Sequence, residues 1–289
     1  MEKPLTETIK QQLIHELKDK SFTQNALLKL LNTPNYIELN RFNLTFSWIP
    51  IKECSIEKIN RLVNRLISLI QTYKITYPIH IWFLPLKIKR LFPKKNEPIS
   101  EQHINGGYTY LSNHTIYVYR LEECSKVMIH ELLHNTYLQT QWSLKDLKPF
   151  YTLLQLSENF TLLPAEAIVE FWALYHQLKF IEKEMGIPFE RLYQDELEWS
   201  LSQTKRLLNY RKKYFPKWME ETNALSYIYF KSCFWYFIQD FMKLRKPYSI
   251  ASVSTFLQTH LLDPNFLKDI HKSKRLTTRS FRMTKYGSL

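Results

Sequence analysis

Residues 127–135 read VMIHELLHN, and the pattern of the chain changes at this stretch. Its apolar residues predict a helix that covers about 122–138. Because residues four apart in a helix point the same way, His130 and His134 share one face. Glu131 follows the first histidine and is rotated by about 100° around the helix axis. The stretch therefore brings two imidazoles and a carboxylate together on one helix.

Strand and helix patterns are mixed before this stretch and helical after it. Alternating or continuous apolar residues predict strands at 42–48, 79–86, 108–111 and 115–120. Helical periodicity predicts helices at 5–18, 21–33 and 55–70, and then at about 164–186, 190–213, 220–245 and 250–261. The predicted fold class is α+β, with a small N-terminal mixed sheet, the motif helix, and a mostly helical C-terminal part.

The same patterns predict three parts. An α+β subdomain covers 1–140 and ends in the motif helix, and a helical subdomain covers 141–270. The remainder, 271–289, is basic and poor in apolar residues, so we expect a surface tail. Residues 87–100 are basic and interrupted by proline, which is typical of a surface loop.

Composition limits the class of protein. The chain has only 4 glycines and 3 cysteines among 289 residues. So few glycines argue against a glycine-rich phosphate loop. The cysteines lie far apart, and neither a signal peptide nor a membrane-spanning stretch is recognisable. We therefore expect a reduced, soluble, intracellular protein with no transmembrane segment, which is not secreted.

A formal net charge of +13 favours acidic partners. Basic residues cluster at 87–90, 211–213 and 272–285. These clusters predict an acidic peptide or protein substrate, or nucleic acid bound through the basic surface. No nucleic-acid-binding motif accompanies them, and an ordinary solvated surface is the alternative.

The spacing in HExxH is typical of a zinc site. His130 and His134 can place two imidazole nitrogens on one tetrahedral Zn²⁺. From its position on the helix, Glu131 can reach a water molecule on the metal without occupying the metal, which suits a general base. The alternative is a surface helix with no metal.

A third ligand is expected downstream, where Glu166 and Glu170 lie four apart on an otherwise apolar helix. Two acids in such a setting are costly unless they are paired or bind a metal. We predict Glu166 as the ligand and Glu170 as the acid that supports a ligand histidine. The two roles could be exchanged, or both could be ordinary acids at a helix start. Glu158 is the next candidate.

HExxH followed by a helix with Glu-x-x-x-Glu resembles the gluzincin group of zinc metallopeptidases. The resemblance implies a zincin-like fold, one Zn²⁺ per chain held by His130, His134 and Glu166, and a peptidase that uses Glu131 as base. The matching motifs cover about residues 105–175. Thirty-one residues separate His134 from Glu166, more than in the shortest gluzincin spacings.

The chain is also similar to uncharacterised metallopeptidases encoded by large DNA viruses. The matching stretches are 105–109, 116–123, 126–134, 166–173 and 281–284. This resemblance implies a viral protein in the host cytoplasm or the virion, and it gives no substrate.

In gluzincins, an edge strand upstream of the motif binds the substrate backbone, and Gly106, Gly107 and Tyr108 are the matching residues here. A simple turn is the alternative. Aminopeptidases of the group carry a glutamate in this region, and this chain has no acid between Ile104 and Arg120. An endopeptidase or a carboxypeptidase is therefore favoured over an aminopeptidase.

A peptidase also needs a donor for the oxyanion, and Tyr227 and Tyr229 are candidates on a later helix. With 18 tyrosines in the chain, a core role is the alternative for both. Two other classes of function remain open. One is a zincin-fold binding protein without turnover, and the other is a basic nucleic-acid-associated protein.

Overall fold

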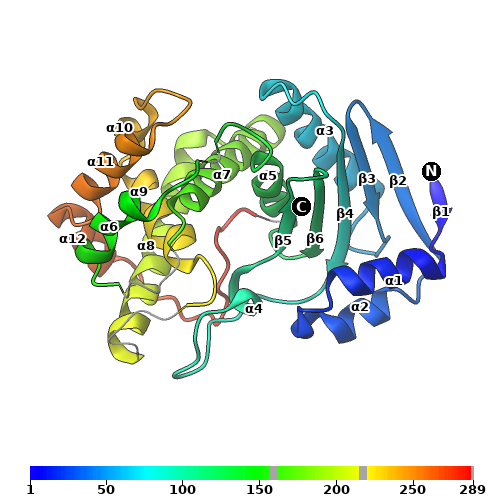
Figure 1. Ribbon diagram of the computed structural model, residues 1–289, viewed down its shortest axis with the longest axis horizontal. Coiled ribbons are helices and arrows are strands. Elements are labelled where there is room, and N and C mark those ends of the chain that lie inside the picture. The colour runs from blue at the N-terminus through cyan, green and yellow to red at the C-terminus, as the bar shows by residue number, and fades with distance from the viewer. Residues whose placement is uncertain (139, 157–161, 215–219, 288–289) are drawn as a thin grey trace. The chain divides into compact units, whose positions relative to one another are not determined.

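The computed structural model describes residues 1–138, 140–156, 162–214 and 220–287, which form two compact units (Figure 1). Each unit is assembled from separate stretches of the chain. Unit 1 comprises Met1–Arg90, Asn105–Thr136 and Gly287–Leu289. Unit 2 comprises Leu91–Ile104 and Tyr137–Tyr286. Residues 91–100 of the predicted surface loop 87–100 thus belong to unit 2.

Unit 1 contains one mixed sheet with the strand order β1-β2-β3-β4-β6-β5. The strands are β1 (Glu2–Pro4), β2 (Asn35–Arg41), β3 (Leu44–Trp48), β4 (Ile79–Leu86), β5 (Gly107–Tyr110) and β6 (Thr115–Arg120). The pairs β3–β4 and β4–β6 are parallel, and the other neighbours are antiparallel. Strand β5 therefore lies at an edge of the sheet, with β6 as its partner.

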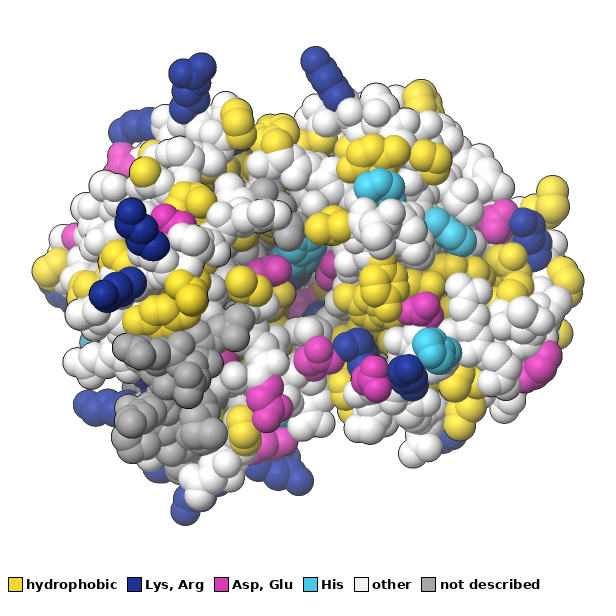
Figure 2. Space-filling view, viewed as in Figure 1, with side chains coloured by type: hydrophobic (Ala, Val, Ile, Leu, Met, Phe, Trp, Pro, Cys, Tyr) yellow, Lys and Arg dark blue, Asp and Glu magenta, His cyan; other side chains and the backbone are white. Residues whose placement is uncertain are grey.

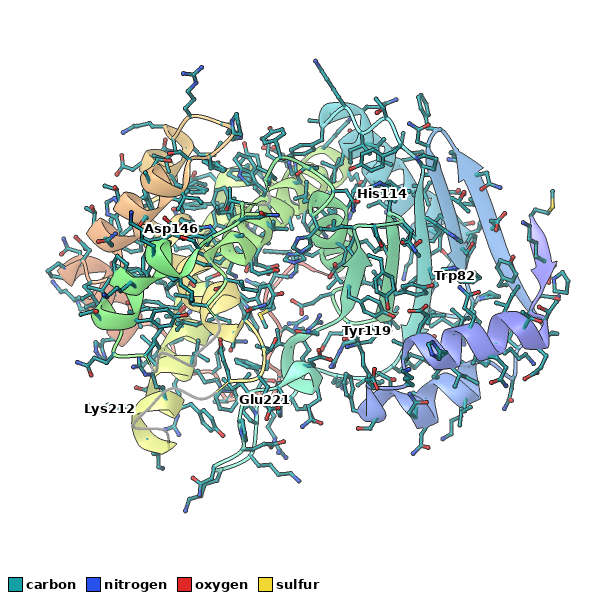
Figure 3. All side chains as sticks on the ribbon, in the orientation of Figure 1. Trp82, His114, Tyr119, Asp146, Lys212 and Glu221 are labelled. Carbon is teal, nitrogen blue, oxygen red and sulfur yellow. The ribbon has the colours of Figure 1, made fainter. Side chains whose placement is uncertain are left out.

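Helices cover both faces of this sheet. They are α1 (Glu7–Glu16), α2 (Gln24–Leu30), α3 (Ile56–Thr72) and α5 (Cys124–Leu133). Trp82 and Tyr119 point toward α1 and α2 and join a buried apolar cluster with residues of those helices (Figure 3). The alternate residues Ile81 and Phe83 are also buried and face the opposite side, because side chains alternate along a strand. There α5 packs against β5, β6 and α3.

Unit 2 is almost entirely helical. Its helices are α4 (Glu101–Ile104), α6 (Leu144–Leu153), α7 (Pro164–Met185), α8 (Phe189–Tyr214), the π-helical turn η2 (Leu225–Phe230), α9 (Lys231–Tyr236), α10 (Ile238–Met242), α11 (Ile250–His260) and α12 (Pro264–Lys272). Helix α7 begins with proline at its first position and ends before Gly186, whose φ is +67°. This agrees with the predicted boundaries, because proline fits the first helical turn and glycine fits the left-handed cap. The apolar core of unit 2 is largely aromatic.

The predicted order, a mixed sheet followed by a mostly helical part, is confirmed. Two details differ. The predicted helix over 220–245 is divided into η2, α9 and α10. The motif helix is shorter than predicted, because α5 begins at Cys124 and ends at Leu133, so that His134 caps it. No helix among the described residues is long and apolar enough to cross a bilayer.

Residues 281–284 of the predicted basic tail are built into unit 2. Phe281 and Thr284 are fully buried. The Lys231 ammonium donates a hydrogen bond to the Met283 carbonyl (2.9 Å), and the Thr284 hydroxyl donates to a Glu196 carboxylate oxygen (2.7 Å). These contacts make residues 281–284 part of the core of unit 2, because buried polar groups require such partners. The prediction of a surface tail over 271–289 is therefore wrong at residues 281–284, whereas most residues of 271–280 are exposed.

The basic clusters are not uniformly exposed either. Arg90, at the end of the cluster 87–90, is 1% exposed and forms an ion pair with the buried Glu123 at 2.8 Å. On the face shown in Figure 2, lysine and arginine side chains are scattered and do not gather into one patch. The net positive charge is therefore not concentrated on a single surface of that face.

Candidate metal centre

Helix α5 is a core helix that carries charged and polar groups. All of its residues from Cys124 to Leu133 are buried, and His130 and Glu131 are only 5% and 7% exposed. Burial of polar groups costs free energy unless they are hydrogen-bonded or bind an ion. Each of these two side chains therefore needs a hydrogen-bond partner or an ion.

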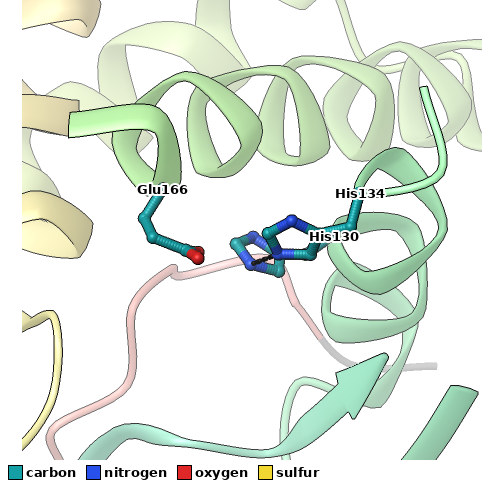
Figure 4. Close-up of side chains that lie close together, drawn as sticks. All are labelled: His130, His134 and Glu166. Carbon is teal, nitrogen blue, oxygen red and sulfur yellow. Dashed lines mark hydrogen bonds between the residues drawn. The ribbon is translucent and has the colours of Figure 1, made fainter. Parts of the chain in front are cut away.

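The two histidines face one another. Their Nε2 atoms are 3.1 Å apart, and the rings are inclined at 77° (Figure 4, dashed line). Two nitrogens that bind one tetrahedral metal at about 2.0–2.1 Å are separated by roughly 3.3 Å. The pair can also share an N–H···N hydrogen bond. The geometry thus fits two ligands of one ion.

Glu166 lies in the first turn of α7 and is half-buried. The Tyr227 hydroxyl donates a hydrogen bond to its Oε2 atom at 3.0 Å. Tyr227 belongs to η2, whose backbone departs from the α-helical pattern. Such π-helical turns are frequent at functional sites.

Potential ligand atoms of His130, His134 and Glu166 all lie within 4.8 Å of one another, so this group could hold a metal ion (Figure 4). The donors are two imidazoles and a carboxylate, a mixture that binds transition metals. The group contains the three residues predicted as ligands.

The carboxylate of Glu131 is held by Thr109, a residue of β5 that was not predicted from the sequence. The Thr109 hydroxyl lies 2.7 Å from Glu131 Oε2 and 3.0 Å from the Glu131 backbone oxygen. Its single proton can be donated to either oxygen. Alternation along a strand puts residues 107 and 109 on one face, and this pattern could have identified Thr109.

The two glycines predicted to bind substrate allow α5 to pack closely on the sheet. A Cβ atom at Gly107 would lie 2.8 Å from the Tyr117 carbonyl oxygen and 3.2 Å from Cγ of Glu131. A Cβ atom at Gly106 would lie 2.4 Å from the Arg90 guanidinium. The absence of side chains at these positions is therefore a packing requirement.

Tyr108 lies on the opposite face from Gly107 and Thr109. Its hydroxyl donates to the backbone oxygen of Glu16 (3.0 Å), and its ring stacks on Tyr117. Burial, together with the nearby Glu16 charge, raises the pKa of the Tyr108 hydroxyl. The structure thus places its side chain in the cluster under α1 and does not bring it to Glu131.

Tyr229 is also separate from the metal-ligand group. It is 2% exposed, its hydroxyl donates to the Leu261 carbonyl, and its ring stacks on Phe266. Burial raises its pKa above the usual value. Of the two tyrosines predicted as oxyanion donors, only Tyr227 contacts Glu166, a predicted ligand, and Tyr229 has the core role.

Glu170 is 1% exposed and lies one helical turn after Glu166. Its support of a ligand histidine stays a prediction. Glu158, the alternative ligand, lies outside the described residues.

Three residues, Tyr77, His114 and Asn135, fix the end of α5, and no role was predicted for them from the sequence. The Tyr77 hydroxyl donates to the Asn135 backbone oxygen at 2.6 Å, and His114 Nδ1 lies 2.9 Å from the Asn135 side-chain oxygen. The rings of Tyr77 and His114 are stacked. These contacts hold the backbone immediately after His134 and so restrict the position of that ring.

In comparisons with protein-family models, curated proteins and solved structures, no match to this chain was found.

Proposed function

We propose that this protein is a zinc-dependent peptidase with a zincin-like site. One observation carries the proposal, namely the grouping of His130, His134 and Glu166, with Glu131 next to the first histidine on the same helix. Two imidazoles and one carboxylate are the protein ligands of many catalytic zinc sites, and they leave one coordination position open. A purely structural zinc site has no need of Glu131.

The ligand group would hold one zinc ion per chain, which would polarise a water molecule and the scissile carbonyl. Glu131 accepts the proton of the attacking water and passes it to the leaving amine. Thr109 orients the carboxylate that carries out this transfer. Tyr227 orients Glu166, and because its proton is donated to that carboxylate, it can stabilise an oxyanion only after leaving it.

The substrate class that fits best is an extended peptide. Strand β5 has β6 as its partner in the sheet order, and an edge strand can add a peptide as a further strand. The sequence offers no acid between Ile104 and Arg120 to bind a free amino terminus. We therefore propose endopeptidase or carboxypeptidase activity, and the net charge of +13 favours acidic substrates.

Metal content tests the site directly. Purified protein is expected to contain about one zinc per chain, measured by elemental mass spectrometry after dialysis. His130→Ala and His134→Ala should each abolish stoichiometric binding. His176→Ala is the control, since this histidine is half-buried on α7 and is not in the ligand group. Full zinc occupancy in a His130→Ala/His134→Ala double variant would refute the assignment.

Glu166 and Glu170 are expected to differ in their effect on zinc affinity. Glu166→Gln removes a charged ligand, whereas Glu170→Gln removes an outer partner, which typically costs about 10- to 100-fold in affinity. We expect the larger loss for Glu166→Gln in a competition titration with a zinc chelator. The opposite ranking would exchange the two roles.

Thr109 is expected to act as a positioning residue. Thr109→Val keeps the shape of the side chain but removes the hydroxyl next to Glu131, and a hydrogen bond to a charged group contributes about 1.5–3 kcal/mol. We expect kcat to fall about tenfold or more while zinc content is unchanged, and Thr109→Ser to restore most of the activity. Equal losses in the Val and Ser variants would show that the residue acts through packing alone.

A further inference from the structure

A cavity of about 460 Å³ in unit 2 is lined by Lys205, Arg206, Lys274 and Arg275. The first two residues belong to α8, and the other two follow α12. No acidic residue occurs among the described residues that line it. Cavities that bind small molecules have volumes of about 300–1,000 Å³.

Lys205 is held in place by backbone groups. Its ammonium donates hydrogen bonds to the carbonyls of His271 (2.7 Å) and Ser273 (2.8 Å), around the end of α12. An ammonium has three N–H donors, so one donor is available to a ligand. The position of this charge is therefore fixed before any ligand binds.

Arg206 is partly withdrawn from solvent. Its guanidinium lies 3.8 Å from the centre of the Phe92 ring and donates to the Ser280 carbonyl at 3.0 Å. Burial, together with the nearby charge of Arg279, lowers its pKa to about 10. An anion in the cavity would stabilise this charge, because opposite charges favour the ionised form.

Acidic side chains near the cavity neutralise little of the positive charge of its four lysine and arginine residues. Lys274 forms an exposed ion pair with Glu198 at 2.6 Å, and exposed pairs contribute little. Arg275 is exposed, and it makes no hydrogen bond or ion pair with the residues that the structure describes. Its planar fork of donors can bind two oxygens of one phosphoryl group.

We propose that this cavity binds the phosphoryl groups of a small polyphosphate ligand, such as a nucleoside triphosphate or an inorganic polyphosphate. Four cations and no acid among the described lining residues suit several adjacent negative charges better than a single carboxylate. A single-stranded nucleic acid fits less well, because such sites combine a long basic groove with aromatic stacking residues. The described lining has no aromatic side chain, and Leu276 is its only apolar residue.

Calorimetric titration of the full chain with inorganic tripolyphosphate, and separately with ATP, tests this proposal. We expect one site per chain at low salt. Arg275→Ala should weaken the binding of tripolyphosphate about tenfold, since a charge-assisted hydrogen bond contributes at least about 1.4 kcal/mol. Arg245→Ala removes the same charge from an exposed position of unit 2 outside the cavity, and it should change affinity less than about twofold.

His130→Ala separates this cavity from the proposed metal centre, and tripolyphosphate should bind that variant as tightly as the wild type. Tighter binding of ATP than of tripolyphosphate would show that the nucleoside contributes, and equal binding would assign the site to phosphoryl groups alone. The proposal is overturned if neither ligand binds, if Arg275→Ala and Arg245→Ala have equal effects, or if His130→Ala abolishes binding. It is also overturned if oligothymidine competes with tripolyphosphate for this site and binds more tightly, because single-stranded nucleic acid would then be the better ligand.

Discussion

Glu131→Gln is expected to abolish peptide hydrolysis while zinc content and thermal stability stay at the wild-type level. The amide has nearly the same size as the carboxylate, and its oxygen can still accept the Thr109 hydroxyl bond that holds Glu131 at 2.7 Å. The residues of the ligand group are unchanged. The amide cannot accept a proton from water, and loss of a general base typically costs about 10²- to 10⁴-fold in rate.

The measurement is cleavage of a peptide library that is biased toward acidic sequences and includes free C-termini, read by mass spectrometry. Glu190→Gln, the same change on an exposed part of α8, is the matched control and should cleave like the wild type. A Glu131→Gln variant that is as active as the wild type would exclude this mechanism. Zinc-loaded wild type that cleaves nothing in the library would favour a binding protein without turnover.

Phe281→Ala is expected to destabilise unit 2 by about 3–5 kcal/mol, the usual cost of removing a buried phenylalanine side chain. Phe281 is fully buried, and its ring contacts Phe92 edge to face at 4.8 Å. The sequence predicts a basic surface tail for this segment, in which the substitution would change stability very little.

The free energy of unfolding is obtained from urea denaturation, with comparison of the midpoint at constant slope. Thr277→Ala, at an exposed position of the same segment, is the control and should change stability by less than about 0.5 kcal/mol. A Phe281→Ala variant as stable as this control would show that the segment does not contribute to the core.

The elements that could be predicted from the sequence have strong local signals. Helix α3 has a serine whose side chain accepts the Lys58 N–H, and α7 has proline and glycine at its ends. The β2–β3 hairpin was only half predicted. Phe42 turns the chain with a φ of 53°, although phenylalanine is not a turn residue, so the alternation from Phe42 to Trp48 resembled one uninterrupted strand.

The candidate site shows a similar division. HExxH identified the two histidines and Glu131, because one helix fixes their spacing. The partners of these residues come from distant parts of the sequence. Thr109 is 22 residues away from Glu131, and Tyr227 is 61 residues away from Glu166. No local pattern ranks one tyrosine among 18, and the burial that distinguishes Tyr229 from Tyr227 is a tertiary property.

The interleaving of the two units along the chain restricts how the protein can be cut into fragments. A piece that covers 137–286 would lack the segment Leu91–Ile104, which belongs to the same unit. The rings of Tyr210 and Phe281 would then lose their contacts with Phe92 and be left open to water. A piece that ends at residue 136 would carry Phe92 without those partners. Expression of either fragment should therefore favour aggregation, and genetic dissection of this protein requires internal substitutions in the intact chain.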